Sequence, residues 1–310
     1  MLLKRRAFLA EVFAALNLAF LTLDIYVAHS VNEFAHWAQW LPLGFTILAA
    51  VALLANLAVS APVRARARSF MRGGGFWTGI AVGVLSVLVG VSGLLWHLES
   101  VFFQVMTLRG LVYSAPFVAP LAFTGVGLLV LLNRLVPEAS AEWGRWLLLL
   151  AWGGFVGNFV LSLVDHAQNG FFEPAEWVPV AVGALAVGWL VLPIFLRVPR
   201  RYLQASLVVL AVALVTGVVG LVLHVIPVVG DPTGTMGERV IYGPPLFAPL
   251  LFSDLALLGG LAVWDLLDRG WVRRRPPSAE REEARHAALA EELAVVADPG
   301  PGPSTSDHIH

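Results

Sequence analysis

Four histidines occupy two kinds of segment, each of which occurs twice along the chain. In the first, His-x-x-Asn-x-Phe is followed by Trp-x-Pro; it runs from His29 to Pro42 and again from His166 to Pro179, with identical offsets. In the second, Gly-x-x-Gly-x-x-x-His ends at His97 and again at His224. Imidazole is a common ligand of haem iron and of transition metals. The repeated histidines therefore indicate a metal or haem centre.

The glycines of the second segment are compatible with a haem groove. They precede each histidine by seven and four residues: Gly90 and Gly93 before His97, Gly217 and Gly220 before His224. Residues at these separations lie on one face of a helix, so each helix would carry a bare groove that ends at an imidazole. A flat macrocycle standing in the membrane needs such a groove. The alternative is that the glycines let two membrane helices pack closely.

Two arginines accompany this segment. Arg109 lies four residues before Tyr113, and Arg239 lies three residues before Tyr242. Each tyrosine opens a further repeat, which runs to Phe123 in the first copy and to Phe252 in the second. Guanidinium groups bind carboxylates well, so we expect Arg109 and Arg239 to neutralise haem propionates.

The pairing of the four histidines has two solutions. His97 and His224 could share one haem near the axis that relates the repeats. Alternatively, His29 pairs with His97 and His166 pairs with His224, which gives one site in each repeat.

A bare metal ion is a second possibility, because more polar groups surround the first segment. They are His36, Glu33, Glu99, Asp165, Glu173 and Glu176. Imidazole together with carboxylate suits zinc, copper or non-haem iron. However, His36 is matched by Glu173 in the repeat, and Glu33 is matched by Gly170. A solvated polar loop with interfacial tryptophans explains these groups more simply than a metal site does.

The composition is that of a membrane protein. The chain of 310 residues is 58% hydrophobic and 13% charged, against about 25% charged residues in soluble domains, and its mean hydropathy is +0.78. It has no cysteine, which excludes disulfides, thiolate metal sites, iron–sulfur clusters and covalently attached haem. The charged residues cluster at segment ends and form no basic face for nucleic acid.

Eight apolar stretches are long enough to cross a bilayer as helices. They are residues 7–28, 41–60, 77–97, 116–136, 146–166, 178–197, 203–225 and 245–267. Pro116 and Pro120, like Pro245 and Pro249, fall in the first turns of the fourth and eighth stretches, where proline is tolerated. Basic residues collect at the chain ends and in alternate connections: Lys4, Arg5, Arg6, Arg64, Arg66, Arg68, Arg72, Arg134, Arg145, Arg197, Arg200, Arg201, Arg269 and Arg273 to Arg275. This places both termini in the cytoplasm and the repeated motifs at the outer face of a bacterial inner membrane.

The duplication predicts the domain organisation. Residues 1–137 and 138–268 form two four-helix repeats, and residues 269–310 form a cytoplasmic tail with a short helix followed by a disordered end. Since each repeat has an even number of spans, both insert in the same orientation. We therefore expect an all-α polytopic membrane protein whose repeats are related by a pseudo-two-fold along the membrane normal.

This layout resembles the haem A synthase group, in which eight spans form two similar four-helix halves with paired histidines as haem ligands. The resemblance covers the arrangement of the spans and no specific motif. In that group the ligand histidines belong to even-numbered helices, whereas the four repeated histidines here end odd-numbered ones.

The sequence thus favours a membrane protein that binds a redox cofactor, b-type haem first, near its outer face, with roles in electron transfer or cofactor handling. Two alternatives remain open. One is a small-solute or ion transporter or channel, for which Glu11, Asn17, Asp24, Asn158 and Asp254 would supply a polar path. The other is an assembly or scaffold subunit of a membrane complex.

Overall fold

Long apolar helices dominate the computed structural model, which describes residues 6–63, 74–269 and 286–290. Seven of the described helices are long and apolar enough to cross a membrane. They are α1 (Arg6–Ser30), α2 (Trp40–Val63), α3 (Gly74–Glu99), α7 (Ala141–Gln168), α8 (Trp177–Phe195), α9 (Arg200–Gly230) and α11 (Leu250–Asp268). The prediction of an all-helical, multi-pass membrane protein is confirmed.

The predicted span 116–136 contains a shorter helix. Here α6 (Leu121–Leu135) has only 15 residues, and a series of turns precedes it. A residue before proline is disfavoured in the α region, so Ala115 before Pro116 and Ala119 before Pro120 resist an earlier start. The prolines therefore lie ahead of the helix instead of in its first turns. The same holds before α11, which begins at Leu250 directly after Pro249.

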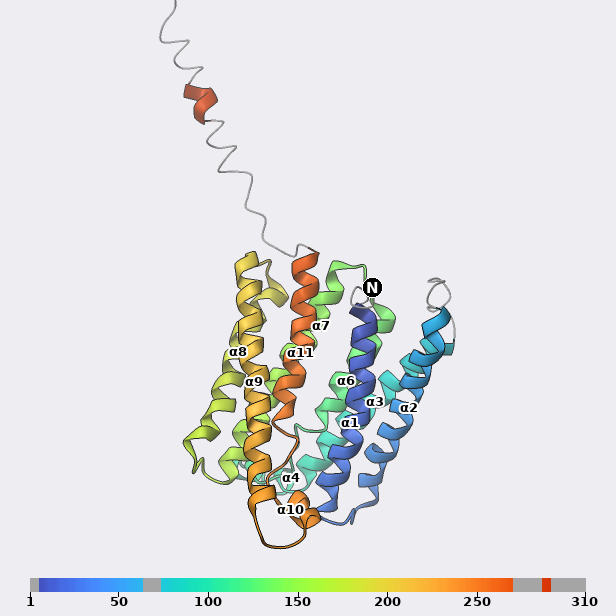
Figure 1. Ribbon diagram of the computed structural model, residues 1–310, viewed down its shortest axis with the longest axis vertical. Coiled ribbons are helices and arrows are strands. Elements are labelled where there is room, and N and C mark those ends of the chain that lie inside the picture. Colours follow the sequence, from blue (N-terminus) through green and yellow to red (C-terminus); the bar gives the residue numbers. More distant parts are fainter. Residues whose placement is uncertain (1–5, 64–73, 270–285, 291–310) are drawn as a thin grey trace, which may run out of the picture. The chain divides into compact units, whose positions relative to one another are not determined.

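The helices pack as two rings of four. In the first ring α1 packs on α2, α2 on α3, α3 on α6 and α6 on α1. In the second ring α7 packs on α8, α8 on α9, α9 on α11 and α11 on α7. Contacts between the rings join α6 to α7 and α1 to α11 (Figure 1). Consequently α1 and α3 lie diagonally opposite each other in the first ring, as α7 and α9 do in the second.

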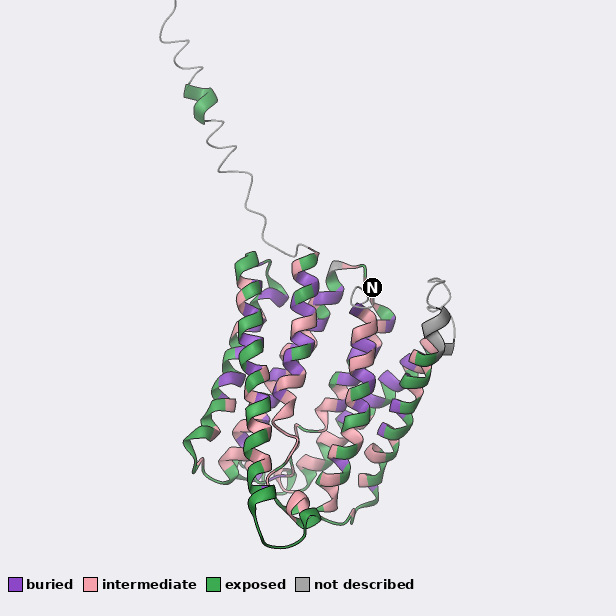
Figure 2. Ribbon diagram, viewed as in Figure 1, coloured by how far each residue is buried: buried purple, intermediate pink, exposed green. Residues whose placement is uncertain are grey.

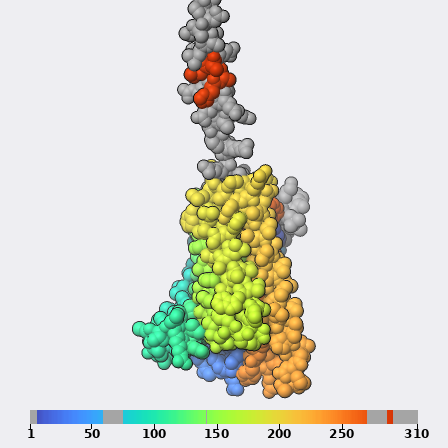
Figure 3. Space-filling view, turned by 90° about the vertical axis from the view of Figure 1, so that its left-hand side faces the viewer, coloured from blue at the N-terminus to red at the C-terminus, as the bar shows by residue number. Residues whose placement is uncertain are grey.

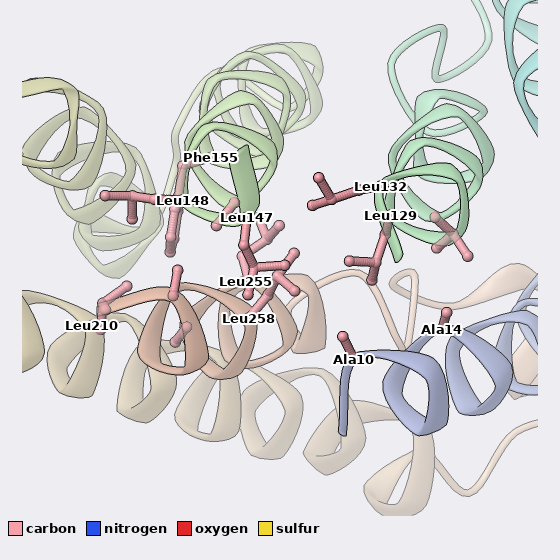
Figure 4. Close-up of a cluster of buried hydrophobic side chains, with 14 of the residues drawn as sticks. Ala10, Ala14, Leu129, Leu132, Leu147, Leu148, Phe155, Leu210, Leu255 and Leu258 are labelled. Carbon is pink, nitrogen blue, oxygen red and sulfur yellow. The ribbon is translucent and has the colours of Figure 1, made fainter. Parts of the chain in front are cut away.

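Apolar side chains fill the space between the helices. Figure 4 shows Leu147 and Phe155 of α7 beside Leu255 of α11, and Leu129 of α6 near Ala14 of α1. Buried residues follow the inward faces of the helices, and exposed ones face outward (Figure 2). Many outward residues are large and apolar, such as Leu48 and Val208. Their exposure is explained by contact with lipid.

Ion pairs fix one end of the bundle. Arg6, at the start of α1, bonds Asp265 through Nη1 at 2.5 Å and also pairs with Asp268, both at the end of α11. Arg269 shares Asp265 at 2.7 Å. The two ends of the membrane part of the chain therefore lie together, at the top in Figure 1.

Short helices form much of the opposite end. They are α4 (Phe102–Val105), α5 (Leu108–Val112), α10 (Met236–Tyr242) and the 3-10 helices η2 (Trp37–Gln39) and η4 (Pro174–Glu176). The segment of α4 and α5 projects at the lower left in Figure 3 and exposes Val105, Met106 and Leu108.

Some predictions concern residues outside the described ranges. Of the tail, which falls in a separate unit from Arg273 onward, the structure describes only 286–290, and these are helical. The rest of the predicted tail helix and the disordered end lie outside. So do the basic residues Lys4, Arg5, Arg64, Arg66, Arg68, Arg72 and Arg273 to Arg275.

Candidate functional site

Each of the four repeated histidines belongs to one of the diagonal helices of a ring. His29 ends α1 and His97 lies near the end of α3; His166 lies near the end of α7 and His224 in the last third of α9. All four are half-buried. They lie at the end of the bundle opposite the ion pairs of Arg6. The predicted ends of the odd-numbered spans are thus correct except that α9 continues for six residues beyond His224.

A backbone carbonyl holds each histidine of the second segment. His97 Nδ1 is 2.9 Å from the oxygen of Pro116, and His224 Nδ1 is 2.8 Å from the oxygen of Pro245. Because a carbonyl only accepts, Nδ1 must carry the hydrogen and donate it. The neutral ring then keeps its lone pair on Nε2, which is the arrangement that metal-ligating histidines commonly use.

The turns before α6 and α11 supply these carbonyls. Pro116 accepts from Ala119 and Pro245 accepts from Ala248 in tight turns, at 3.1 and 3.3 Å. Each oxygen has a second lone pair, which takes the imidazole N–H. The sequence repeats these prolines visibly, but a role played by a backbone oxygen leaves no signal in residue types.

The structure brings His29 and His97 together in the first ring. Their ring centroids are 6.3 Å apart, with the ring planes at 89°. In the second ring His166 and His224 belong to the corresponding diagonal helices, α7 and α9. The contact of the first pair is compatible with the hypothesis that His29 pairs with His97, and the pairing of the other two histidines stays a prediction.

The opening motif forms a turn that places an aromatic ring beside the first histidine of each pair. Phe34 N donates to the oxygen of His29 at 3.2 Å, and Phe171 N donates to the oxygen of His166 at 3.1 Å. Both phenylalanines have a positive φ, 54° and 53°. Phe34 stacks on Trp40 with centroids 4.4 Å apart, and Phe171 stacks on Trp177 at 4.0 Å. The motif thus holds an aromatic side chain, itself stacked on a tryptophan, against the imidazole in each ring.

The glycine faces pack against neighbouring helices. A Cβ on Gly93 would lie 2.8 Å from Pro120 Cβ, and one on Gly220 would lie 2.7 Å from Pro249 Cβ. A Cβ on Gly90 would clash with Thr124, and one on Gly217 with Ser253. The close packing that was the alternative to a cofactor groove is therefore present. These glycines let the turns approach α3 and α9 and so position the carbonyls that hold the histidines.

The two arginines of the sequence prediction lie on matching short helices but bond locally. The guanidinium of Arg109, on α5, lies 5.7 Å from the ring centroid of Tyr113. Arg239, on α10, donates to the backbone oxygen of Asp231 and lines an open hollow of about 290 Å³. Neither is bonded to a histidine among the described residues.

Hydrogen bonds in the loop that carries Arg239 stabilise two carboxylates. Thr233 donates to Asp231 through its hydroxyl and its N–H, and Thr235 donates to Glu238 through its N–H and its hydroxyl. The bonds from Thr233 lower the pKa of Asp231, and those from Thr235 lower the pKa of Glu238. This loop is thus held by carboxylates that must stay ionised.

The polar groups around the first segment do not gather into a bare-metal site. His36 Nδ1 accepts from Ala38 N at 3.3 Å and caps η2. Within the part of the chain that the structure describes, no group of three or more His, Asp or Glu side chains is placed to hold a metal ion. A bare zinc or copper ion would find too few protein ligands.

One acidic residue does approach a histidine. Glu176 Oε2 is 3.7 Å from His166 Nδ1, and Glu176 Oε1 accepts from Asn169 Nδ2 at 3.3 Å. The residue at the same offset in the first motif, directly before the tryptophan, is Gln39.

Several residues of the supposed polar path have structural partners. Arg134 bonds both oxygens of Glu11, at 2.7 and 2.5 Å. Asn17 donates to Asp254 at 2.9 Å across the interface between the rings. These contacts join α1 to α6 and α1 to α11.

The arrangement places four imidazoles at one end of a membrane bundle, and two of them, those of His29 and His97, are in contact. No family model, no curated protein and no solved structure matches this chain. The role of the histidines must therefore follow from their own geometry and chemistry.

Proposed function

We propose that the protein is an electron-transfer or haem-handling protein of a bacterial inner membrane, with one b-type haem site in each four-helix ring. His29 and His97 are the ligands in the first ring, and His166 and His224 are the ligands in the second. The observation that carries the proposal is the contact of the His29 and His97 imidazoles across the first ring, together with Nε2 of His97 and of His224 left as a lone-pair donor.

The donor set favours haem over a bare ion. Each site offers two imidazoles, and the described residues add no third ligand side chain. Haem brings four equatorial nitrogens of its own and needs only axial ligands from the protein. Bound there, it would supply a one-electron redox centre. Facing helices of a bundle are a common setting for such cofactors.

The spacing of the first pair is compatible with two imidazoles that would hold one iron. Two imidazoles on one metal, with bonds of about 2.0–2.1 Å, have centroids about 5 to 6.4 Å apart, depending on the angle at the metal. The His29 and His97 centroids are 6.3 Å apart.

The proposal includes the duplication, with residues 1–137 and 138–268 as repeats and the 116–136 segment as an eighth crossing. Two observations support it. Matching helices make matching contacts in the two rings, and the two ends of the membrane part of the chain lie together. Both ends of the membrane part can lie on one side only if the chain crosses the membrane an even number of times. In this proposal α6 and the turn before it form the eighth crossing. The positive-inside rule then assigns the end with Arg6 and Arg269 to the cytoplasm.

In this proposal Gly90, Gly93, Gly217 and Gly220 are positioning residues for the histidine pairs. Arg109 and Arg239 are assigned to the propionates, because they are the cations on α5 and α10 at the histidine end. The guanidinium of Arg109 lies beside the ring of Tyr113.

The test is the absorption spectrum of protein produced with ample haem and purified in detergent. The expected results are a Soret band, a positive pyridine haemochrome reaction and two haems per chain. His97→Ala and His224→Ala should each remove about one haem, and the double variant should remove both. His36→Ala is the matched control, because His36 caps η2 and bonds no other histidine; it should retain both haems.

A colourless preparation that is folded by circular dichroism would overturn the proposal. Solute flux in proteoliposomes that depends on Asp254 would then favour transport, and co-purified subunits without flux would favour a scaffold role.

A further inference from the structure

One difference between the two histidine pairs is a carboxylate that faces a histidine. In the second ring the carboxylate of Glu176 faces His166 Nδ1 at 3.7 Å. The residue at the same offset in the first motif is Gln39, whose Oε1 accepts from the backbone N–H of His36 at 3.2 Å. His29 therefore has no carboxylate in the place where His166 has one.

Glu176 is held in this position. Its oxygen Oε1 accepts from Asn169, the asparagine of the repeated motif, which leaves Oε2 on the side of His166. Its side chain is 12% exposed, so solvent screens its charge only partly. Among the described residues Oε2 has no hydrogen-bond partner, and 3.7 Å is too long for a hydrogen bond. Glu176 thus acts on His166 mainly through its charge.

A carboxylate beside Nδ1 has two consequences. A lone pair that faced the anion would be repelled, so the hydrogen of neutral His166 resides on Nδ1 and the lone pair on Nε2. A carboxylate behind a ligating imidazole also raises its basicity and stabilises the more positive state of a bound metal. Neither effect exists for His29, since Gln39 is neutral.

We propose that Glu176 makes the two sites unequal and gives the second ring the centre with the lower reduction potential. This inference rests on the proposed function and adds a difference between its two haem sites. Here Glu176 is a positioning residue, because it acts through His166.

The first test is a spectroelectrochemical titration of the haem-loaded protein. The wild type should show two one-electron components of equal amplitude. Glu176→Gln should raise the lower of the two reduction potentials. The expected shift changes the ratio of oxidised to reduced centre at least tenfold, which corresponds to about 59 mV for a one-electron couple. The reciprocal change Gln39→Glu should lower the other component. Glu173→Gln is the control, because the Glu173 side chain is exposed and makes no cap hydrogen bond; it should leave both potentials unchanged.

A second test needs no haem. With ¹⁵N-labelled histidine in the haem-free protein, the His166 signals should show the hydrogen on Nδ1, and Glu176→Leu should weaken that preference while the His29 signals stay unchanged. The inference would be overturned if Glu176→Gln left both reduction potentials unchanged, or if neutral His166 in the wild type carried its hydrogen on Nε2. A different outcome separates the two proposals. If the protein bound no haem but Glu176→Leu still weakened the preference of the His166 hydrogen for Nδ1, the proposed function would be overturned and the effect of Glu176 on His166 would remain.

Discussion

His97 donates a hydrogen bond from Nδ1 to the carbonyl oxygen of Pro116, 2.9 Å away and 19 residues later in the chain. The contact requires the turn before α6 to lie directly against α3. Gly93 permits this, since it lies four residues before His97 and faces Pro120. The orientation of the imidazole therefore depends on the absence of a side chain one helical turn below it.

Gly93→Ala should destabilise the protein by about 1–3 kcal/mol, because the new Cβ would lie 2.8 Å from Pro120 Cβ and would push the turn away. Gly220→Ala should behave alike beside Pro249. The measurement is the midpoint of unfolding in detergent, followed by circular dichroism. Gly44→Ala is the control, since a Cβ there meets nothing within 4 Å and adds only helix propensity. Equal midpoints for Gly93→Ala and Gly44→Ala would contradict the packing argument.

Glu11→Gln should destabilise the protein by about 3–5 kcal/mol, because it removes the charge that compensates the buried guanidinium of Arg134. The double change Glu11→Leu with Arg134→Leu should restore most of this loss, since two apolar groups of similar volume need no partner there. Unfolding midpoints of the three variants and the wild type provide the check. If the single variant were as stable as the wild type, the pair would not join α1 to α6.

The loop from Asp231 to Glu238 should lose its order in acid. Hydrogen bonds lower the folded-state pKa of both carboxyl groups below their unfolded values of about 3.9 and 4.3. Such groups contribute stability that is present above the unfolded pKa and is lost as the pH falls through the folded pKa. The loop should thus be ordered at pH 6 and open progressively below about pH 4.

Hydrogen exchange of the loop amides, corrected for the intrinsic rate at each pH, measures this opening. Thr233→Val and Thr235→Val should weaken protection already at pH 6. The α5 segment is the internal control, because its cap is the neutral Thr107, whose hydroxyl accepts from Gly110 N at 3.0 Å. Equal losses of protection in both segments would indicate general unfolding instead.

Hydropathy along the chain was sufficient to locate the membrane helices. A bilayer-spanning helix needs an uninterrupted apolar length, and length is a local property of the sequence. The starts of the 116–136 and 245–267 spans differ from the prediction. A proline disfavours the α region in the residue before it, so the helices begin only after Pro120 and Pro249, and α6 has 15 residues.

The histidines themselves were also visible in the sequence, because a repeated pattern identifies residues by type and offset. Their partners were not visible. Glycine spacing indicates that something lies close to a helix face, but a cofactor and a neighbouring helix require the same bare surface, and the structure places Pro120 and Pro249 there.

The sequence alone determined that this is a multi-pass membrane protein with histidines in matched segments, since both facts depend only on local composition and spacing. The tertiary structure decided which histidines meet, which carbonyls hold them, and that Glu176 faces only one pair. These relations join residues on different helices. They depend on the order of helices around each ring, which no local pattern encodes.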